Sequence, residues 1–176
     1  VHNARPVDEE AHLDRLEHSL TELGIAAPMS RAAMKIVVRE TLARNRIRNG
    51  IVYMQVTRGV ASREHNYPAG LKPVLVVTAR HTDPARRASV LRDGISVVTV
   101  PDQRWARCDI KSISLLPNVL ARQAAKDRGV QEAWQVDADG MVTEGAATNA
   151  WIVDNAGVLR TRPADGGILN GIVRQT

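Results

Sequence analysis

A change of pattern near residue 85 divides the sequence into two αβ pieces. Before it, leucines recur at helical spacing between residues 13 and 23, behind a leading group of acidic residues. Gly24 is a typical C-terminal stop for that helix. Ser30 is placed to cap a second helix over about residues 31–45. The sequence therefore opens with two helices.

Strand-like segments follow the helices. Residues 51–59 alternate as a strand does, and residues 72–79 carry a Val and Leu run that predicts a buried strand. The loop "REHNYPAG" separates the two. Residues 82–93 are polar and rich in arginine, which is typical of a domain junction. We therefore expect a small αβ domain over residues 1–84 and a larger one over residues 85–176.

The second piece has a different order of elements. A strand is expected in "GISVVTVP", and then a helix over about residues 115–128 that Gly129 closes. Two hairpins are expected next, with turns at Asp139-Gly140 and at residues 155–157. "ILNGIVRQT" ends in a glycine-bounded helix start. These patterns predict a mixed fold, α+β or α/β, in two domains.

Composition narrows the classes of function. The net charge is +5 and the pI is about 10, but the arginines are scattered, and only 3% of residues are aromatic. Few aromatic side chains are therefore available for base stacking, and we expect no nucleic-acid partner. One cysteine excludes an intrachain disulfide and a cysteine-only metal site, and it fits a reducing compartment. No apolar run approaches membrane-span length, and no signal peptide opens the chain, so a cytoplasmic protein is expected.

The segment "RWARCDIKSISLLPNVLARQ", over residues 104–123, holds a single lysine, Lys111, ahead of the expected helix. Ile110 and Ile113 flank it and an apolar run follows, so the side chain could be at least half buried. Burial lowers the pKa of a lysine, and a neutral amine is a nucleophile suited to Schiff-base formation. The alternative is a solvated lysine near a helix start.

A Schiff-base lysine could serve pyridoxal phosphate if three other groups are present. A phosphate clamp uses arginine or backbone N–H groups, a carboxylate pairs with the pyridinium nitrogen, and a further group holds the substrate carboxylate. Glu144 at an expected strand end could be the carboxylate, and Arg63 and His65 in a loop could hold the substrate. Arg15 and the backbone around Ile172 could bind phosphate. Each of these side chains could instead be a solvated surface group.

Five motifs, in order along the whole chain, indicate a family. They are "HLDRL", "VTRG…REHNYP", "RCDIKSISLLPNVLARQAAKDRG", "GMVTEGAATNAWIV" and "ILNGIVR". Together they resemble the class IV (fold-type IV) pyridoxal-phosphate aminotransferases, and within them the D-amino-acid transaminases. The resemblance implies the two-domain fold-type IV architecture, with a small N-terminal domain and a large cofactor-binding domain.

The resemblance also implies roles for residues that match the motifs. Lys111 would hold pyridoxal 5'-phosphate as a Schiff base and move the proton of the substrate α-carbon. Glu144 would pair with the pyridine nitrogen, and Arg63 and His65 would grip the substrate carboxylate. The remaining cofactor-binding positions, which serve the phosphate, the ring and their surroundings, would be Arg15, Thr148, Asn149, Leu169, Ile172 and Val173.

The sequence departs from the family pattern in two motifs. Val173 stands where a threonine commonly contacts phosphate, so one hydrogen bond of about 1 kcal/mol is expected to be missing. Ala146 and Ala147 stand where small hydroxyl residues often follow "TEG", which leaves Thr148 as the hydroxyl there. Both changes are expected to weaken cofactor binding or to alter specificity.

The implied reaction is transamination of D-amino acids, in which D-alanine and 2-oxoglutarate give pyruvate and D-glutamate, in a homodimer. Alternatives on the same fold are a branched-chain or (R)-amine transaminase and an enzyme like aminodeoxychorismate lyase. The sequence also reads as a fragment cut at both ends, without a first strand of the small domain and without the later part of the large domain. A truncated, non-catalytic domain is therefore a further alternative, and poor turnover is expected of this chain alone.

Overall fold

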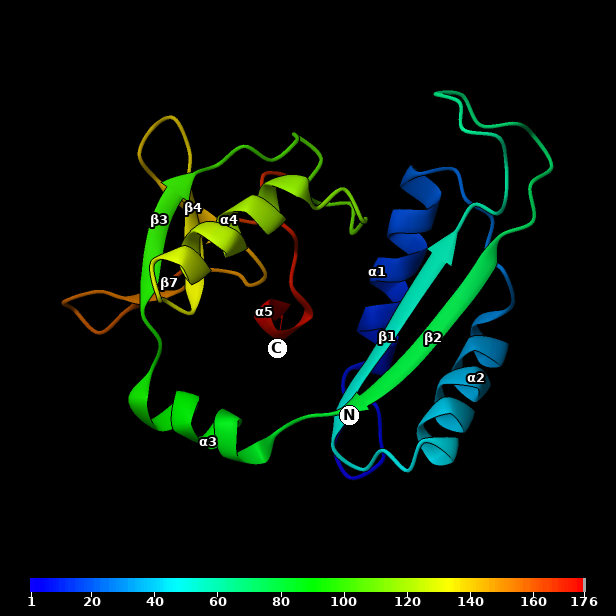
Figure 1. Cartoon of the computed structure of the whole chain (residues 1–176), viewed down its shortest axis with the longest axis horizontal. Helices are drawn as coiled ribbons and strands as arrows, with labels where there is room; N and C mark the ends of the chain where they lie inside the picture. The colour runs from blue at the N-terminus through cyan, green and yellow to red at the C-terminus, as the bar shows by residue number, and fades with distance from the viewer. Residues whose placement is uncertain (176) are drawn as a thin grey trace. The chain divides into compact units, whose positions relative to one another are not determined.

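The structure is a computed structural model that describes residues 1–175. The chain forms two compact units, Val1–Pro84 and Ala85–Thr176. Figure 1 colours both from the N-terminus to the C-terminus.

Two helices open the first unit, as the leucine spacing predicts. Helix α1 spans Glu9–Glu22, and Gly24 lies beyond it with a φ of 59°, a conformation that glycine adopts without strain. Helix α2 spans Arg31–Arg44, and the Ser30 hydroxyl accepts a hydrogen bond from the Ala33 N–H at 3.3 Å. The predicted cap is therefore confirmed.

An antiparallel pair of strands, β1 (Gly50–Thr57) and β2 (Val74–His81), completes the first unit. Its core is formed by Val38, Leu42 and Ile47, with partly buried strand residues packed against them. The prediction that the second strand is buried is wrong, because Val74 and Val76 are 47% and 44% exposed. Side chains alternate between the two faces of a strand, and only one face of β2 meets the core.

A long loop joins β1 to β2 over residues 58–73 and carries Arg63 and His65. Arg58 fastens the base of this loop to the connection between α1 and α2. Its guanidinium donates to the carbonyls of Leu23 and Gly24, the latter at 2.8 Å. It also stacks over the Tyr67 ring, with 3.5 Å between the guanidinium carbon and the ring centroid.

The second unit opens with a helix that the sequence did not indicate. Helix α3 spans Pro84–Asp93, where we expected only a polar junction. No residue of α3 is buried, so it lacks the apolar stripe from which helices are predicted.

A three-stranded sheet forms the centre of the second unit, in the order β3-β4-β5. Strand β3 (Val97–Pro101) runs parallel to β4 (Glu132–Val136), and helix α4 (Leu116–Asp127) connects them. Strand β5 (Val142–Gly145) returns antiparallel to β4 through a turn at Gly140, as predicted. The core between α4 and the sheet is formed by small residues, namely Ala121, Ala125, Ala133 and Ala146.

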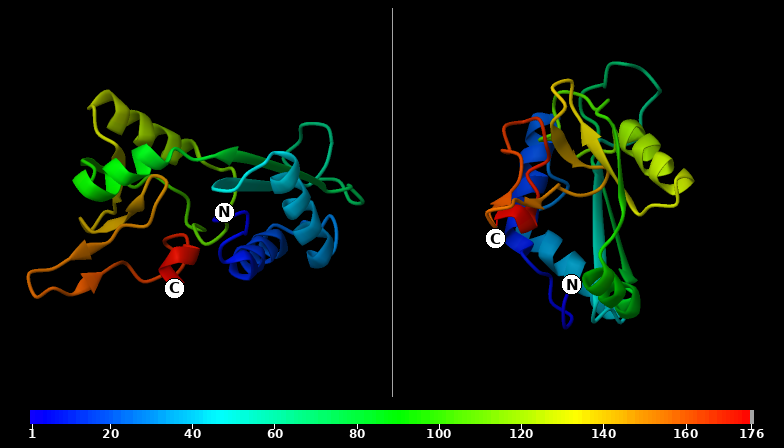
Figure 2. Two further views of the ribbon diagram at one scale, coloured as in Figure 1. Left: turned by 90° about the horizontal axis from the view of Figure 1, so that it is seen from below. Right: turned by 90° about the vertical axis from the view of Figure 1, so that its left-hand side faces the viewer.

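The second predicted hairpin is also present, with short strands β6 (Ile152–Val153) and β7 (Leu159–Arg160) around Gly157. Figure 2 shows this hairpin, in orange, projecting from the rest of its unit. The chain then reaches α5 (Ile172–Gln175), the predicted glycine-bounded helix start. No helix within residues 1–175 has the length and apolar character needed to cross a bilayer.

Candidate active site

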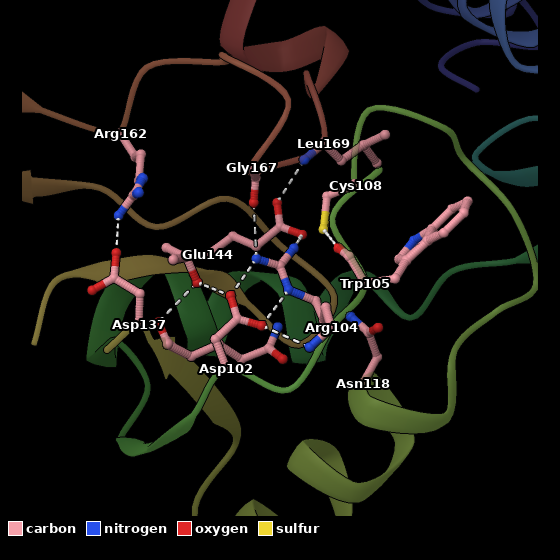
Figure 3. Close-up of polar contacts among 12 residues, drawn as sticks. Asp102, Arg104, Trp105, Cys108, Asn118, Asp137, Glu144, Arg162, Gly167 and Leu169 are labelled. Atoms are coloured by element: carbon pink, nitrogen blue, oxygen red, sulfur yellow. Dashed lines mark hydrogen bonds and ion pairs between the residues drawn. The ribbon is translucent and has the colours of Figure 1, made fainter. Parts of the chain in front are cut away.

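A buried carboxylate lies at the end of β5. Glu144 is 7% exposed, and three groups donate to it. Arg104 Nη1 forms an ion pair with Oε1, while the Leu169 N–H and Asn149 Nδ2 donate to Oε2 at 3.0 Å and 3.3 Å. Figure 3 shows this carboxylate between Arg104 and Leu169. The hydrogen bonds fix its orientation within the second unit.

Opposing effects set the ionisation of Glu144. Burial raises its pKa, whereas the charge of Arg104 and the hydrogen bond from the Leu169 backbone lower it. The net effect is a raised pKa. The positive charge of Lys111 also lowers this pKa, which makes the lysine an electrostatic neighbour of the carboxylate.

Arg104 is held from its other side by a second carboxylate, Asp102, just beyond the end of β3. Arg104 Nη2 and Nε bond the two oxygens of Asp102 at 2.6 Å and 2.9 Å, and the Thr143 hydroxyl donates to Asp102 at 2.6 Å. The side chains of Arg104 and Asp102 are only 5% and 13% exposed. Burial raises the pKa of Asp102, but the bonds from Arg104 and Thr143 outweigh that effect and leave it at about 2.

Sequence reasoning missed Asp102 and Arg104. Both lie in "PDQRW", directly after an apolar strand. An acid and an arginine two residues apart at a strand end can reach the same buried site, and this spacing is the signal that could have identified them.

Lys111 lies in an irregular segment between β3 and α4 and is exposed, so the prediction of a half-buried side chain is wrong. Ile110 is 6% exposed and packs inward, but Ile113 is 71% exposed. The two apolar neighbours therefore do not enclose the lysine within this unit. Helix α4 begins only at Leu116, which leaves Lys111 in the loop ahead of it.

The segment after β5 brings further predicted residues beside Glu144. Asn149 Nδ2 also donates to the Leu169 carbonyl at 2.9 Å, so its amide ties the end of β5 to the segment before α5. Gly171 permits this approach, because a Cβ there would lie 2.1 Å from Asn149 Oδ1. The Thr148 hydroxyl donates to Glu132 Oε2 at 3.4 Å.

Two predicted residues form the first turn of α5. Ile172 is 3% exposed and anchors the turn in its unit, whereas Val173 is 83% exposed. The apolar Val173 side chain offers no hydroxyl to a ligand.

The other predicted residues belong to the first unit. Arg15 is half-buried on α1, where its Nη2 lies 3.4 Å from His12 Nδ1, and burial lowers the pKa of its guanidinium. Arg63 and His65 are exposed in the β1–β2 loop, whose backbone bends at both residues. The extended geometry that would place both side chains on one side is therefore not adopted.

Comparisons with known proteins agree with the motifs. The model of the amino-transferase class IV family matches residues 1–176. The chain is 42% identical over 166 residues to a D-alanine aminotransferase of Bacillus licheniformis, covering 94% of this chain and 57% of the relative.

Solved structures show the same fold. A branched-chain amino acid aminotransferase of Escherichia coli superposes with a TM-score of 0.82 at 23% identity, over 95% of this chain and 56% of that one. A hypothetical aminotransferase from Mycobacterium tuberculosis, in its α-ketoglutarate- and PMP-bound form, gives a TM-score of 0.82 at 25% identity, over 99% and 62%.

The fold is therefore that of the fold-type IV aminotransferases. The chain belongs to the class IV aminotransferase family, whose cofactor is pyridoxal phosphate. It spans somewhat more than half the length of the curated relatives that it matches.

Proposed function

We propose that this chain supplies active-site residues of a pyridoxal-phosphate-dependent transaminase of D-amino acids, which converts D-alanine and 2-oxoglutarate to pyruvate and D-glutamate. The observation that carries the proposal is the anchored, buried carboxylate of Glu144. The D-alanine aminotransferases that resemble this chain at about 40% identity support the choice of substrate.

The residues present fit the cofactor. An ionised carboxylate offers about four acceptor positions, and in the hydrogen bonds of residues 1–175 Glu144 uses three of them. The remaining one is on Oε1, and it suits the N–H of a protonated pyridine. Leu169, whose N–H donates to the other oxygen, carries an apolar side chain against which a flat ring can pack.

Each group has a distinct proposed role. The cofactor, when bound, supplies an electron sink for the carbon that loses a proton. Glu144 would keep the proton on the pyridine nitrogen, and the Lys111 amine would take the α-proton of the substrate and deliver it to the cofactor carbon C4′. The resemblance to the family assigns the phosphate to the backbone at Ile172 and Val173 and to Arg15, and it assigns Thr148 and Asn149 to the cofactor site.

Arg63 and His65 are proposed to bind the substrate carboxylate. Their exposure in the β1–β2 loop leaves both side chains available for an anionic ligand. A guanidinium and an imidazole together provide several donors for a carboxylate, which favours α-amino acids over simple amines. The carboxylate contact distinguishes the proposal from an (R)-amine transaminase. The resemblance distinguishes it from branched-chain aminotransferases and aminodeoxychorismate lyases, which usually lack this pair.

Covalent trapping tests the proposed lysine. The protein is mixed with pyridoxal phosphate, reduced with borohydride and mapped by peptide mass spectrometry. Its four lysines are Lys35, Lys72, Lys111 and Lys126. We expect dominant labelling at Lys111, and its loss in Lys111→Ala but not in the matched Lys126→Ala. Labelling spread over all four would contradict the proposal and support a non-catalytic domain.

A substrate panel tests the reaction. With 2-oxoglutarate as acceptor, D-alanine should be consumed and L-leucine and (R)-1-phenylethylamine should not. Arg63→Ala should raise KM for D-alanine more than it lowers kcat, because it removes binding of the carboxylate. A preference for branched-chain L-amino acids would assign the chain to the alternative class.

A homodimer and a cytoplasmic location complete the proposal. The homodimer follows from the family resemblance, and the location is supported by the lone cysteine, Cys108, which is a free thiol. Sedimentation of the full-length protein measures the first, and fractionation of cells measures the second.

A further inference from the structure

The buried cluster of Asp102, Arg104 and Glu144 carries a net charge. Arg104 contributes one positive charge, and Asp102 and Glu144 each contribute a negative one, so the three side chains sum to one negative charge. All three are at least 87% covered from solvent, with exposed side-chain fractions of 5%, 13% and 10%. Burial of a net charge is costly unless an opposite charge meets it.

Only one of the two carboxylates has room for a further partner. Asp102 receives Arg104 Nη2 and Nε, the Arg104 backbone N–H and the Thr143 hydroxyl, which fill about four acceptor positions. Within residues 1–175, Glu144 retains a position on Oε1, the oxygen that Arg104 also contacts. The unbalanced negative charge is therefore available at Glu144.

We propose that Asp102 is a positioning residue that acts on the cofactor through Arg104. Its negative charge offsets that of Arg104, so that the Asp102–Arg104–Glu144 cluster keeps one negative charge for the protonated pyridine nitrogen. This inference rests on the function proposed above. Without Asp102 the cluster would be neutral, and the protonated ring would lack a balancing charge.

Other titratable groups face the same cluster. Lys111 places a positive charge near Glu144, and the Cys108 thiol lies near Arg104 and both carboxylates. Burial raises the pKa of Cys108, the charge of Arg104 opposes this rise, and the neighbouring carboxylates add to it. The net effect is a raised pKa, which keeps the thiol neutral near neutral pH. Asp109 adds a further negative charge at Cys108. These groups are unchanged in a variant at position 102, so the difference from the parent protein isolates Asp102.

The test uses the full-length holoenzyme loaded with pyridoxal phosphate labelled with nitrogen-15 in the ring. The chemical shift of that nitrogen is followed against pH in the parent protein and in Asp102→Asn. We expect the pH at which the nitrogen loses its proton to fall by about one unit or more in the variant. A carboxylate that only holds the loop in place would leave this shift unchanged.

Asp137→Asn is the matched control. Asp137 also pairs with an arginine of the second unit, Arg162, and accepts backbone N–H groups of its turn. Figure 3 shows that pair apart from Glu144. The Asp137→Asn variant should lower the stability of the protein without changing the chemical shift of the ring nitrogen. Asp102→Glu restores the charge and should restore the protonated signal, and Asp102→Ser replaces the asparagine variant if that does not fold.

A second measurement needs no cofactor. Titration of the Glu144 carboxyl by carbon-13 NMR should give a lower pKa in Asp102→Asn than in the parent protein, because the neighbouring negative charge is removed. An unchanged nitrogen shift in a variant that binds the cofactor would overturn this inference alone. A parent protein that binds no cofactor would overturn the proposed function and this use of Asp102 with it.

Discussion

At the candidate site, hydrogen bonds and ion pairs offset the free-energy cost of burying ionised side chains. Asp102 illustrates this, because burial favours its neutral form while Arg104 and Thr143 favour the carboxylate. The hydrogen bonds prevail, and the pKa lies at about 2, below the ordinary value of 3.8. A carboxyl with a depressed pKa stabilises the folded state above the pKa that it has in the unfolded chain.

The stability of the second unit should therefore depend on Asp102 in a pH-dependent manner. Near neutral pH, the free energy of unfolding of the parent protein should exceed that of Asp102→Asn by at most about 2 kcal/mol. Solvent screening of the ion pair makes the difference smaller than this limit. The difference should persist down to about pH 4 and vanish towards about pH 2. Urea unfolding followed by tryptophan fluorescence measures it, with the exposed turn residue Asp139→Asn as control. A difference independent of pH would show that the charge of Asp102 is not involved.

Val173 is the residue whose replacement should improve binding. If the backbone of α5 binds phosphate as proposed, Val173→Thr adds a hydroxyl donor there, worth about 1 kcal/mol, or roughly a fivefold tighter dissociation constant for pyridoxal phosphate. Equilibrium dialysis of the full-length protein measures the constant. Val153→Thr makes the same change at an exposed position of β6 and should have no effect. Equal affinities in all three proteins would place position 173 away from the phosphate.

At the scale of the elements, the side-chain amide of Asn149 joins the end of β5 to the segment before α5. Asn149 bridges Glu144 and Leu169, and Gly171 leaves it the space to do so. Gly171→Ala should displace the amide and weaken cofactor binding roughly tenfold or more, because the bonds to both partners are strained. Gly167→Ala is the control, since a Cβ there would meet Asp165 at 3.4 Å, an ordinary contact. Cofactor titration compares the two, and an equal loss in both would contradict the role given to Asn149.

Elements with a strong local pattern were predicted from the sequence, and those without one were missed. Leucine spacing and Ser30 located α1 and α2, and the turn at Gly140 located the β4–β5 hairpin. Helix α3 was missed because it buries nothing. The parallel pairing of β3 with β4 joins segments about 35 residues apart, and no local pattern encodes such a partner.

The residues of the candidate site divide in the same way, into those that the sequence predicted and those that it missed. Motif resemblance selected Glu144, which is buried and anchored as a site carboxylate should be. It did not select Asp102 or Arg104, because their importance arises from contacts across the sheet to residues some 40 positions away. The expected burial of Lys111 failed for a related reason, since flanking isoleucines in an irregular segment need not face the same way.

At the scale of the whole molecule, each unit has its own core. Val38, Leu42 and Ile47 form the first, and small residues between α4 and the sheet form the second. All three tryptophans, Trp105, Trp134 and Trp151, belong to the second unit, so their fluorescence reports only that unit.

Leu42→Ala should destabilise the first unit by about 2–5 kcal/mol, because Leu42 is 3% exposed and its removal leaves a cavity. Far-UV circular dichroism in urea should show an earlier transition while the tryptophan transition stays in place. Ile168→Ala, at a side chain 1% exposed in the second unit, should do the reverse. A tryptophan transition that moves with Leu42→Ala would show that the two cores unfold together.

The attachment of Arg58 at the base of the β1–β2 loop bears on how substrate preference can diversify. Leu23, Gly24 and Tyr67 hold the foot of the loop, while the segment with Arg63 and His65 stays outside the core. Mutations in that segment are therefore expected to leave the hairpin register and the helices unchanged, so that selection can explore new side chains there with little loss of stability. The same segment is the one to exchange between related enzymes when a transaminase that accepts another substrate is to be engineered.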